Sequence, residues 1–190
     1  MPHTRRTPRR PLRHIITLSQ LDRANTQVST EMARHGIWSD ELAGVGVFLV
    51  PASLTCYGWH DGSIAIPSIS GAHLRDLCNG QHTRLTDVLR HEWAHAVADT
   101  FSGFVESDLF VRCFDGAYQD TSPVANYDPS RHVTRYAAAR PCEDFAEVFH
   151  YYLRHRSRLP LRLSSRKPVV KKWEFIHRMA RRIAAGKFSF

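Results

Sequence analysis

The segment His91-Glu92-Trp93-Ala94-His95 combines two imidazoles and a carboxylate at a spacing that suits metal chemistry. Residues four apart lie on one face of a helix, so both imidazoles can bind one ion at about 2.0–2.1 Å. Glu92 then lies beside the open position of the ion, where it can accept a proton from zinc-activated water. In a chain with 12 histidines, the same five residues could also arise by chance on an exposed helix face. A third ligand has to decide between these interpretations.

The segment directly after the motif does not supply a third ligand. The metzincin continuation of H-E-x-x-H requires Gly and His where this chain has Ala98 and Phe101. A second helix with Glu143 and Glu147, four residues apart, offers two carboxylates on one face. Their repulsion disappears if one binds Zn²⁺ and the other accepts a hydrogen bond from a ligand histidine. Periodicity does not say which glutamate binds the metal, and an exposed acidic face is the alternative.

These residues together resemble the gluzincin zinc metallopeptidases. The segments 91–99 and 136–149 are similar to the pattern of the anthrax lethal factor catalytic domain and its bacterial relatives. That pattern is H-E-F-G-H-A-V-D-D, followed later by a Tyr placed seven residues before an E-x-F-A-E-x-F segment. The resemblance covers roughly residues 45–155. Ala94 stands where the family usually has Gly, and alanine is well tolerated in a helix.

The resemblance implies a role for each matched residue. Glu143 would be the third zinc ligand beside the two histidines, and Glu147 would hold a ligand histidine in place. Tyr136 would help to hold the water or the transition-state oxyanion, and Glu92 would be the general base. It thus implies a zinc-dependent endopeptidase acting on a peptide or protein. By the same analogy, an extended substrate would pair with a strand formed by Ser63, Ile64, Ala65 and Ile66.

Hydrophobic spacing predicts the two helices that must hold these residues. Residues 85–101 place apolar side chains at helical intervals, and Gly103 follows just beyond the end. A second helix is predicted from Pro141 to about His155, because proline favours the first position and acidic residues follow in the first turn. Each motif is therefore expected on a helix with one apolar face.

The N-terminal half predicts a helix over about 18–35 and a buried strand over 45–50. Asp61-Gly62 between two short β-like segments indicates a hairpin, and Pro67 suits the end of an edge strand. We therefore expect an α+β, zincin-like fold. A small, twisted, mostly antiparallel sheet would pack on the motif helix and the glutamate-bearing helix.

Charge divides the chain into three parts. Residues 1–14 and 154–190 contain 17 of the 26 basic residues and one of the 18 acidic ones, so the middle is acidic. We expect a flexible basic arm over 1–14, a metallopeptidase domain over 15–155, and a basic extension over 156–190 with a helix at about 169–185. The acidic middle argues against a nucleic-acid-binding core, although the basic ends could contact nucleic acid or an anionic membrane.

The four cysteines form no C-x-x-C pair, which favours free thiols over a zinc ribbon or a disulfide framework. The basic N-terminus lacks the apolar segment of a signal peptide, and no run of 18 apolar residues follows. These features predict a cytoplasmic protein, or one exported by a route without a cleavable signal peptide.

Other functions remain open at this point. A regulatory, repressor-cleaving protease of the ImmA/IrrE kind shares H-E-x-x-H and a later acidic helix, but it lacks the seven-residue spacing from Tyr136 to Glu143. A catalytically silent metal-binding interaction protein would have no reason to keep Glu92 and Tyr136. A nucleic-acid-associated protein would use its basic ends and would bind DNA in a salt-dependent way. An exported effector or toxin is compatible with the same motifs.

Overall fold

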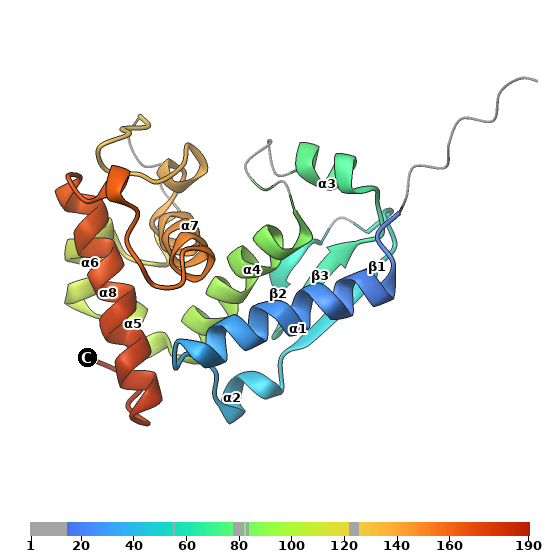
Figure 1. Ribbon diagram of the computed structural model, residues 1–190, viewed down its shortest axis with the longest axis horizontal. Helices are drawn as coiled ribbons and strands as arrows, with labels where there is room; N and C mark the ends of the chain where they lie inside the picture. The colour runs from blue at the N-terminus through green and yellow to red at the C-terminus, as the bar shows by residue number, and fades with distance from the viewer. Residues whose placement is uncertain (1–14, 55, 78–81, 83, 122–125) are drawn as a thin grey trace, which may run out of the picture.

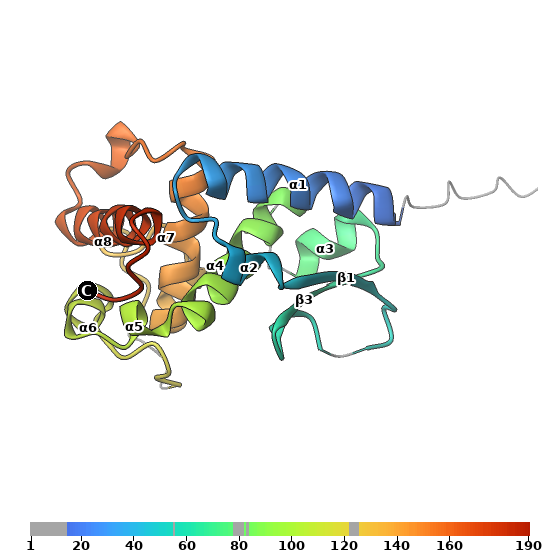
Figure 2. The same cartoon turned by 90° about the horizontal axis from the view of Figure 1, so that it is seen from below.

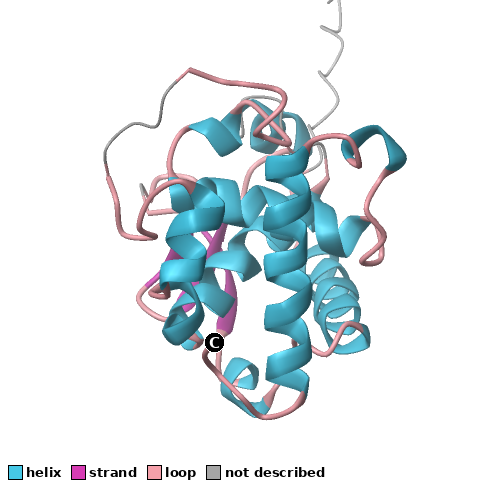
Figure 3. Cartoon of the chain, turned by 90° about the vertical axis from the view of Figure 1, so that its left-hand side faces the viewer, coloured by secondary structure: helices cyan, strands magenta, loops and turns pink. Residues whose placement is uncertain are grey.

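The computed structural model describes residues 15–54, 56–77, 82, 84–121 and 126–190. The predicted basic arm over 1–14 lies outside the described residues. Helices dominate the chain and pack against one small sheet, so the fold is α+β as predicted (Figure 3). The elements in chain order are α1 (Leu18–Arg34), α2 (Asp40–Ala43), β1 (Gly46–Val50), β2 (Gly58–His60), β3 (Ser63–Pro67), α3 (Gly71–Leu77), α4 (Leu85–Thr100), α5 (Ser102–Val105), α6 (Asp108–Phe114), the 3₁₀ turn η1 (Tyr136–Ala138), α7 (Pro141–Arg154), the 3₁₀ turn η2 (Leu161–Leu163) and α8 (Lys167–Ala184).

The sheet has the strand order β1-β3-β2. The predicted hairpin is present, because Asp61 and Gly62 both adopt positive φ angles (46° and 76°) between the antiparallel strands β2 and β3. The prediction of a mostly antiparallel sheet is wrong, since β1 pairs in parallel with β3 along its whole length. β3 is consequently the central strand and not an edge.

One face of the sheet is covered by α1 and α4, as Figure 2 shows from below. Thr17 and Gln20 form a capping box that begins α1, and a buried stripe follows one face of this helix. From the sheet, Ile64 and Ile66 enter the same core with almost no exposed surface. The core therefore lies between the sheet and α4, which places α4 in the middle of the molecule.

The C-terminal helix α8 packs against α6 and α7 (Figure 1). Its buried side chains belong to the same hydrophobic core as the sheet and α4, and Phe175 contacts the rings of Phe110, Phe114 and Phe145. The predicted division of residues 156–190 from the domain therefore does not match the packing. The basic side chains of α8 suggested an appendage, but its apolar face completes the core.

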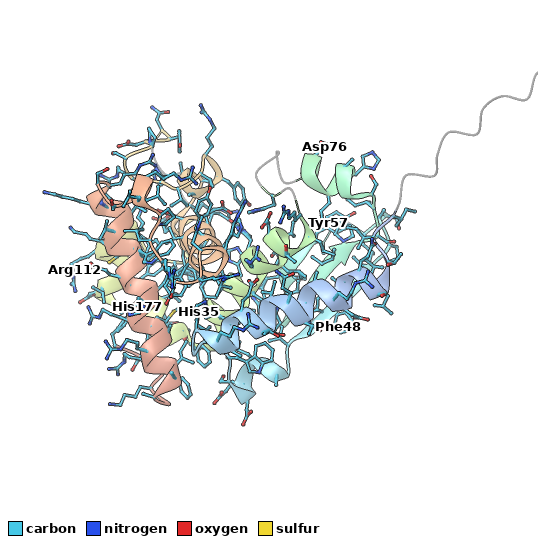
Figure 4. All side chains as sticks on the ribbon, viewed as in Figure 1. His35, Phe48, Tyr57, Asp76, Arg112 and His177 are labelled. Carbon is cyan, nitrogen blue, oxygen red and sulfur yellow. The ribbon has the colours of Figure 1, made fainter. Side chains whose placement is uncertain are left out.

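A small polar cluster joins the N-terminal and C-terminal helices. The ring of His35 lies 5.7 Å from that of Tyr152, whose Oη is 3.1 Å from Nδ1 of His177. Figure 4 labels His35 and His177, which both contact Tyr152. The C-terminal ends of α1 and α7 therefore meet the middle of α8.

Among the described helices, none is long and apolar enough to cross a membrane. Cys56, Cys113 and Cys142 are free thiols, and Cys78 lies outside the described residues.

Candidate metal centre

Helices α4 and α7 form the most extensive contact between two elements of the fold, and together they carry the candidate centre. His91 and His95 lie one turn apart on α4. Pro141 occupies the first turn of α7 and Glu143 follows in the same turn. The packing of two regular helices thus brings together side chains that are 52 residues apart in the sequence.

Three potential ligand atoms converge between these helices. Nε2 of His91 lies 3.2 Å from Nε2 of His95 and 3.1 Å from Oε2 of Glu143, and the third separation, from His95 to Glu143, is 3.6 Å. Ligand atoms at tetrahedral angles and about 2.0–2.1 Å from a zinc ion are about 3.3–3.4 Å apart. The donor set and its spacing both fit Zn²⁺.

The outer contacts of the histidines favour the tautomers that bind a metal. Nδ1 of His91 lies 2.8 Å from Oε1 of Glu147, a carboxylate that can only accept, so Nδ1 carries the proton. In the neutral ring, Nε2 then offers its lone pair to the centre. Nδ1 of His95 lies 2.9 Å from Oη of Tyr118 and can donate to it in the same way. Carboxylate and hydroxyl partners of this kind orient metal-binding histidines in general.

The electrostatics of the centre favour a positive charge at its middle. Burial disfavours the imidazolium form of His91, yet its hydrogen bonds with Glu143 and Glu147 outweigh burial and raise its pKa to about 10. Burial also opposes ionisation of Glu143, but the two histidines hold the pKa of this carboxyl well below its usual range. A proton and a divalent cation therefore compete for the same nitrogen, and metal binding would release the proton.

Glu92 is held by the outer strand β2. Its Oε2 accepts a hydrogen bond of 2.8 Å from the backbone N–H of Trp59. The preceding residue, Gly58, has a φ of +88°, and a Cβ at this position would lie 2.7 Å from the same carboxylate oxygen. Only glycine fits this close approach without strain. The strand therefore fixes the position of the predicted general base.

Tyr136 lies on η1 beside the centre, with its ring centroid 5.5 Å from that of His91. Burial and the negative charge of Glu143 raise the pKa of Tyr136. The phenol consequently keeps its proton at neutral pH and can donate a hydrogen bond.

Two cavities meet at the centre, and Glu92, His91 and Tyr136 line both. The smaller, of about 280 Å³, has apolar walls from β3 and α4. The larger, of about 500 Å³, extends past polar and charged side chains, Asp99 and Arg140 among them. A chain lying across the centre could therefore reach a different chemical environment on each side.

The prediction that Ser63, Ile64, Ala65 and Ile66 pair with substrate is wrong in its geometry. β2 and β1 occupy the two sides of β3, and Ile64 is completely buried. Ala65 and Ile66 still line the smaller cavity, so they can contact a bound side chain. The outer strand next to Glu92 is β2.

Several residues at the centre were not predicted. Tyr118 and His82 come from segments outside regular elements, for which no periodic signal exists. Lys172 of α8 is fully buried and pairs at 2.5 Å with Asp144, the neighbour of Glu143. Burial nevertheless raises the pKa of Asp144 to about 7. A glycine in a strand can indicate that another group approaches the backbone closely, and Gly58 is the position in β2 where this pattern could have indicated the contact with Glu92.

A scan against protein-family models and searches of curated proteins and solved structures found no match to this chain. The resemblance to gluzincins thus stays a prediction, and the functional argument depends on the geometry of the centre.

Proposed function

We propose that this protein is a zinc-dependent endopeptidase. The observation that carries the proposal is the convergence of His91, His95 and Glu143, with donor atoms 3.1–3.6 Å apart, on a centre bordered by Glu92 and Tyr136. Two imidazoles and one carboxylate leave a fourth tetrahedral position for water or substrate, as catalytic zinc sites do. A structural site would instead be closed by a fourth protein ligand.

In the proposed reaction, Zn²⁺ held by the three ligands would supply Lewis acidity toward the scissile carbonyl and the attacking water. Glu92 accepts the proton of that water and later delivers it to the leaving amine. The backbone N–H of Trp59 keeps the carboxylate in place through this exchange. Tyr136, protonated at neutral pH, donates a hydrogen bond to the oxyanion that develops on the carbonyl oxygen.

The surroundings favour an extended peptide or protein as substrate. β2 is an outer strand that passes directly beside Glu92, so the main-chain groups of its outer edge, apart from the N–H of Trp59 that binds Glu92, can form hydrogen bonds with a bound chain. The smaller cavity, walled by Ala65, Ile66 and Val88, suits an apolar side chain next to the cleaved bond. Recognition on both sides of the centre is what an endopeptidase requires.

Two variants, each of which replaces one carboxylate by an amide, test this proposal. Glu92→Gln removes the base but none of the three ligands, so we expect unchanged zinc content and loss of cleavage of a peptide library or a protein mixture. Glu106→Gln makes the same change on an exposed residue and is the matched control. Cleavage that persists in Glu92→Gln would contradict the mechanism. Zinc binding without any Glu92-dependent cleavage would favour a metal-binding interaction protein instead.

A further inference from the structure

A second group of potential metal ligands lies beside the first centre. His82, Glu147 and His150 each offer a donor atom, and these atoms lie within 4.8 Å of one another. Glu147 and His150 are three residues apart on α7, so they share its buried face. His82 comes from the segment just before α4. The cluster therefore joins two separate parts of the chain.

The cluster continues a row of imidazoles that begins at the first centre. Ring centroids are 5.0 Å apart between His95 and His91, 5.1 Å between His91 and His82, and 5.0 Å between His82 and His150. Glu147 lies between the two centres, with Oε1 2.8 Å from Nδ1 of His91 and 3.0 Å from Nε2 of His82. Oε1 thus contacts a histidine of each centre, and Oε2 is left without a hydrogen-bond partner among the described residues.

Four atoms of this cluster are buried without a hydrogen-bond partner among the described residues: Oε2 of Glu147, Nδ1 of His150 and both ring nitrogens of His82, of which Nε2 lies 3.0 Å from Oε1 of Glu147. The residues themselves are 0%, 1% and 4% exposed. Buried polar atoms in native proteins are normally satisfied, so several orphans at one point indicate a missing partner.

The hydrogen-bond contacts of His150 indicate what kind of partner fits the unsatisfied atoms of the cluster. Its Nε2 lies 3.3 Å from Oδ1 of Asp87, a carboxylate that also accepts a hydrogen bond of 2.8 Å from Nη1 of Arg90. The ionised carboxylate accepts the Nε2 proton, so Nδ1 of a neutral ring offers a lone pair. Oε2 of Glu147 is likewise an acceptor. Electron-pair donors that face one another call for a cation or a doubly donating water.

We propose that His82, Glu147 and His150 bind a second metal ion, and that the ion is zinc, because two imidazoles and one carboxylate are again a zinc donor set. All three ligands are buried, and they leave a fourth tetrahedral position that a buried water would fill. The ion ties the segment before α4 to α7. It also fixes Glu147, the carboxylate that orients His91, so the second site supports the affinity of the first.

Metal content of the full chain tests this site separately from the peptidase proposal. The protein is purified without an affinity tag, washed with a weak chelator and analysed for zinc per chain by mass spectrometry. We expect two equivalents in the wild type and one in His95→Phe, which disables only the first centre. We also expect one in His150→Phe and one in His82→Phe, with circular dichroism as the control for folding.

One equivalent in the wild type and none in His95→Phe would overturn the second site and leave a buried water as the partner. Two equivalents that persist in both His82→Phe and His150→Phe would also overturn it. If those two variants fail to fold, the zinc content of His95→Phe still shows whether the second site binds an ion. Two zinc ions per chain without peptide cleavage would contradict only the peptidase proposal. One zinc ion per chain with Glu92-dependent cleavage would contradict only the second metal site.

Discussion

Gly58 lies where β2 passes beside the Glu92 carboxylate, and we predict that alanine at this position removes most of the peptidase activity. The residue has a φ of +88°, and the added Cβ would lie 2.7 Å from Oε2 of Glu92. Real side chains do not approach this closely, so either the carboxylate or the strand must move. A shift of the carboxylate also breaks its hydrogen bond with Trp59.

Two magnitudes follow from this geometry. A left-handed φ costs a residue other than glycine about 1–2 kcal/mol, which for a domain of this size lowers the melting temperature by about 2–8 °C. Moving a catalytic group by about 1 Å costs roughly 10²-fold in rate. Zinc content should stay unchanged, because none of the three ligands lies on β2.

Gly62 is the matched control in the same hairpin. Its φ is +76°, but an added Cβ would meet no described atom within 4 Å. Gly62→Ala should therefore lose similar stability and keep wild-type kcat, as measured with a quenched fluorescent peptide. Equal activity of the two variants would refute the contact between β2 and the general base. A parallel loss of zinc in Gly58→Ala would refute the claim that the strand acts on Glu92 alone.

Three further predictions concern the ligands, the phenol and pH. Glu143→Gln should remove zinc from the centre, whereas Glu147→Gln should weaken its affinity only about 10–100-fold; the reverse order in competition with a chelator would exchange their roles. Tyr136→Phe should keep zinc and lower kcat by about 10²–10³, as loss of one oxyanion donor does; unchanged kcat would exclude it from catalysis. Burial raises the pKa of Glu31, but hydrogen bonds with Arg90 and Gln27 bring it below its ordinary 4.5. Stability from this ion pair is thus present at neutral pH and lost as the pH falls below 4.5, so the denaturation midpoints of wild type and Glu31→Gln should converge there; a constant difference would contradict the ion pair.

The site residues on helices could be predicted because helical spacing is a local property. His91 and His95, and Glu143 and Glu147, are pairs four residues apart, so each pair shares a face before any tertiary contact is known. That α4 and α7 face each other came only from the family resemblance. The structure brings the two pairs together.

The sheet order could not be predicted, because strand pairing depends on contacts that are distant in the sequence. The hairpin at Asp61-Gly62 is local and was found, but its insertion beside β1 with β3 in the centre has no local signal. The edge assigned to Ser63–Ile66 was wrong for this reason. The outer edge beside the centre is formed by the short strand β2, which also holds Glu92.

The contribution of α8 to the core could not be predicted from its charge, because its basic side chains favour a surface helix while its apolar face is buried. Trp173 and Ile176 lie on the apolar face of this basic helix, yet no sequence pattern identifies the helices against which that face packs. From the sequence alone, Lys172 is expected on the surface like the other basic residues of this helix. Only the structure shows it fully buried against Asp144, one residue from a predicted ligand.

The most direct test of the zinc centre is an anomalous difference map, recorded at the zinc absorption edge from crystals of the wild-type protein. We predict a peak about 2.0–2.2 Å from Nε2 of His91, Nε2 of His95 and a carboxylate oxygen of Glu143. The peak should be absent from crystals of Glu143→Ala grown under the same conditions. A wild-type map without a peak at these three atoms, from protein that carries zinc in solution, would contradict the assignment.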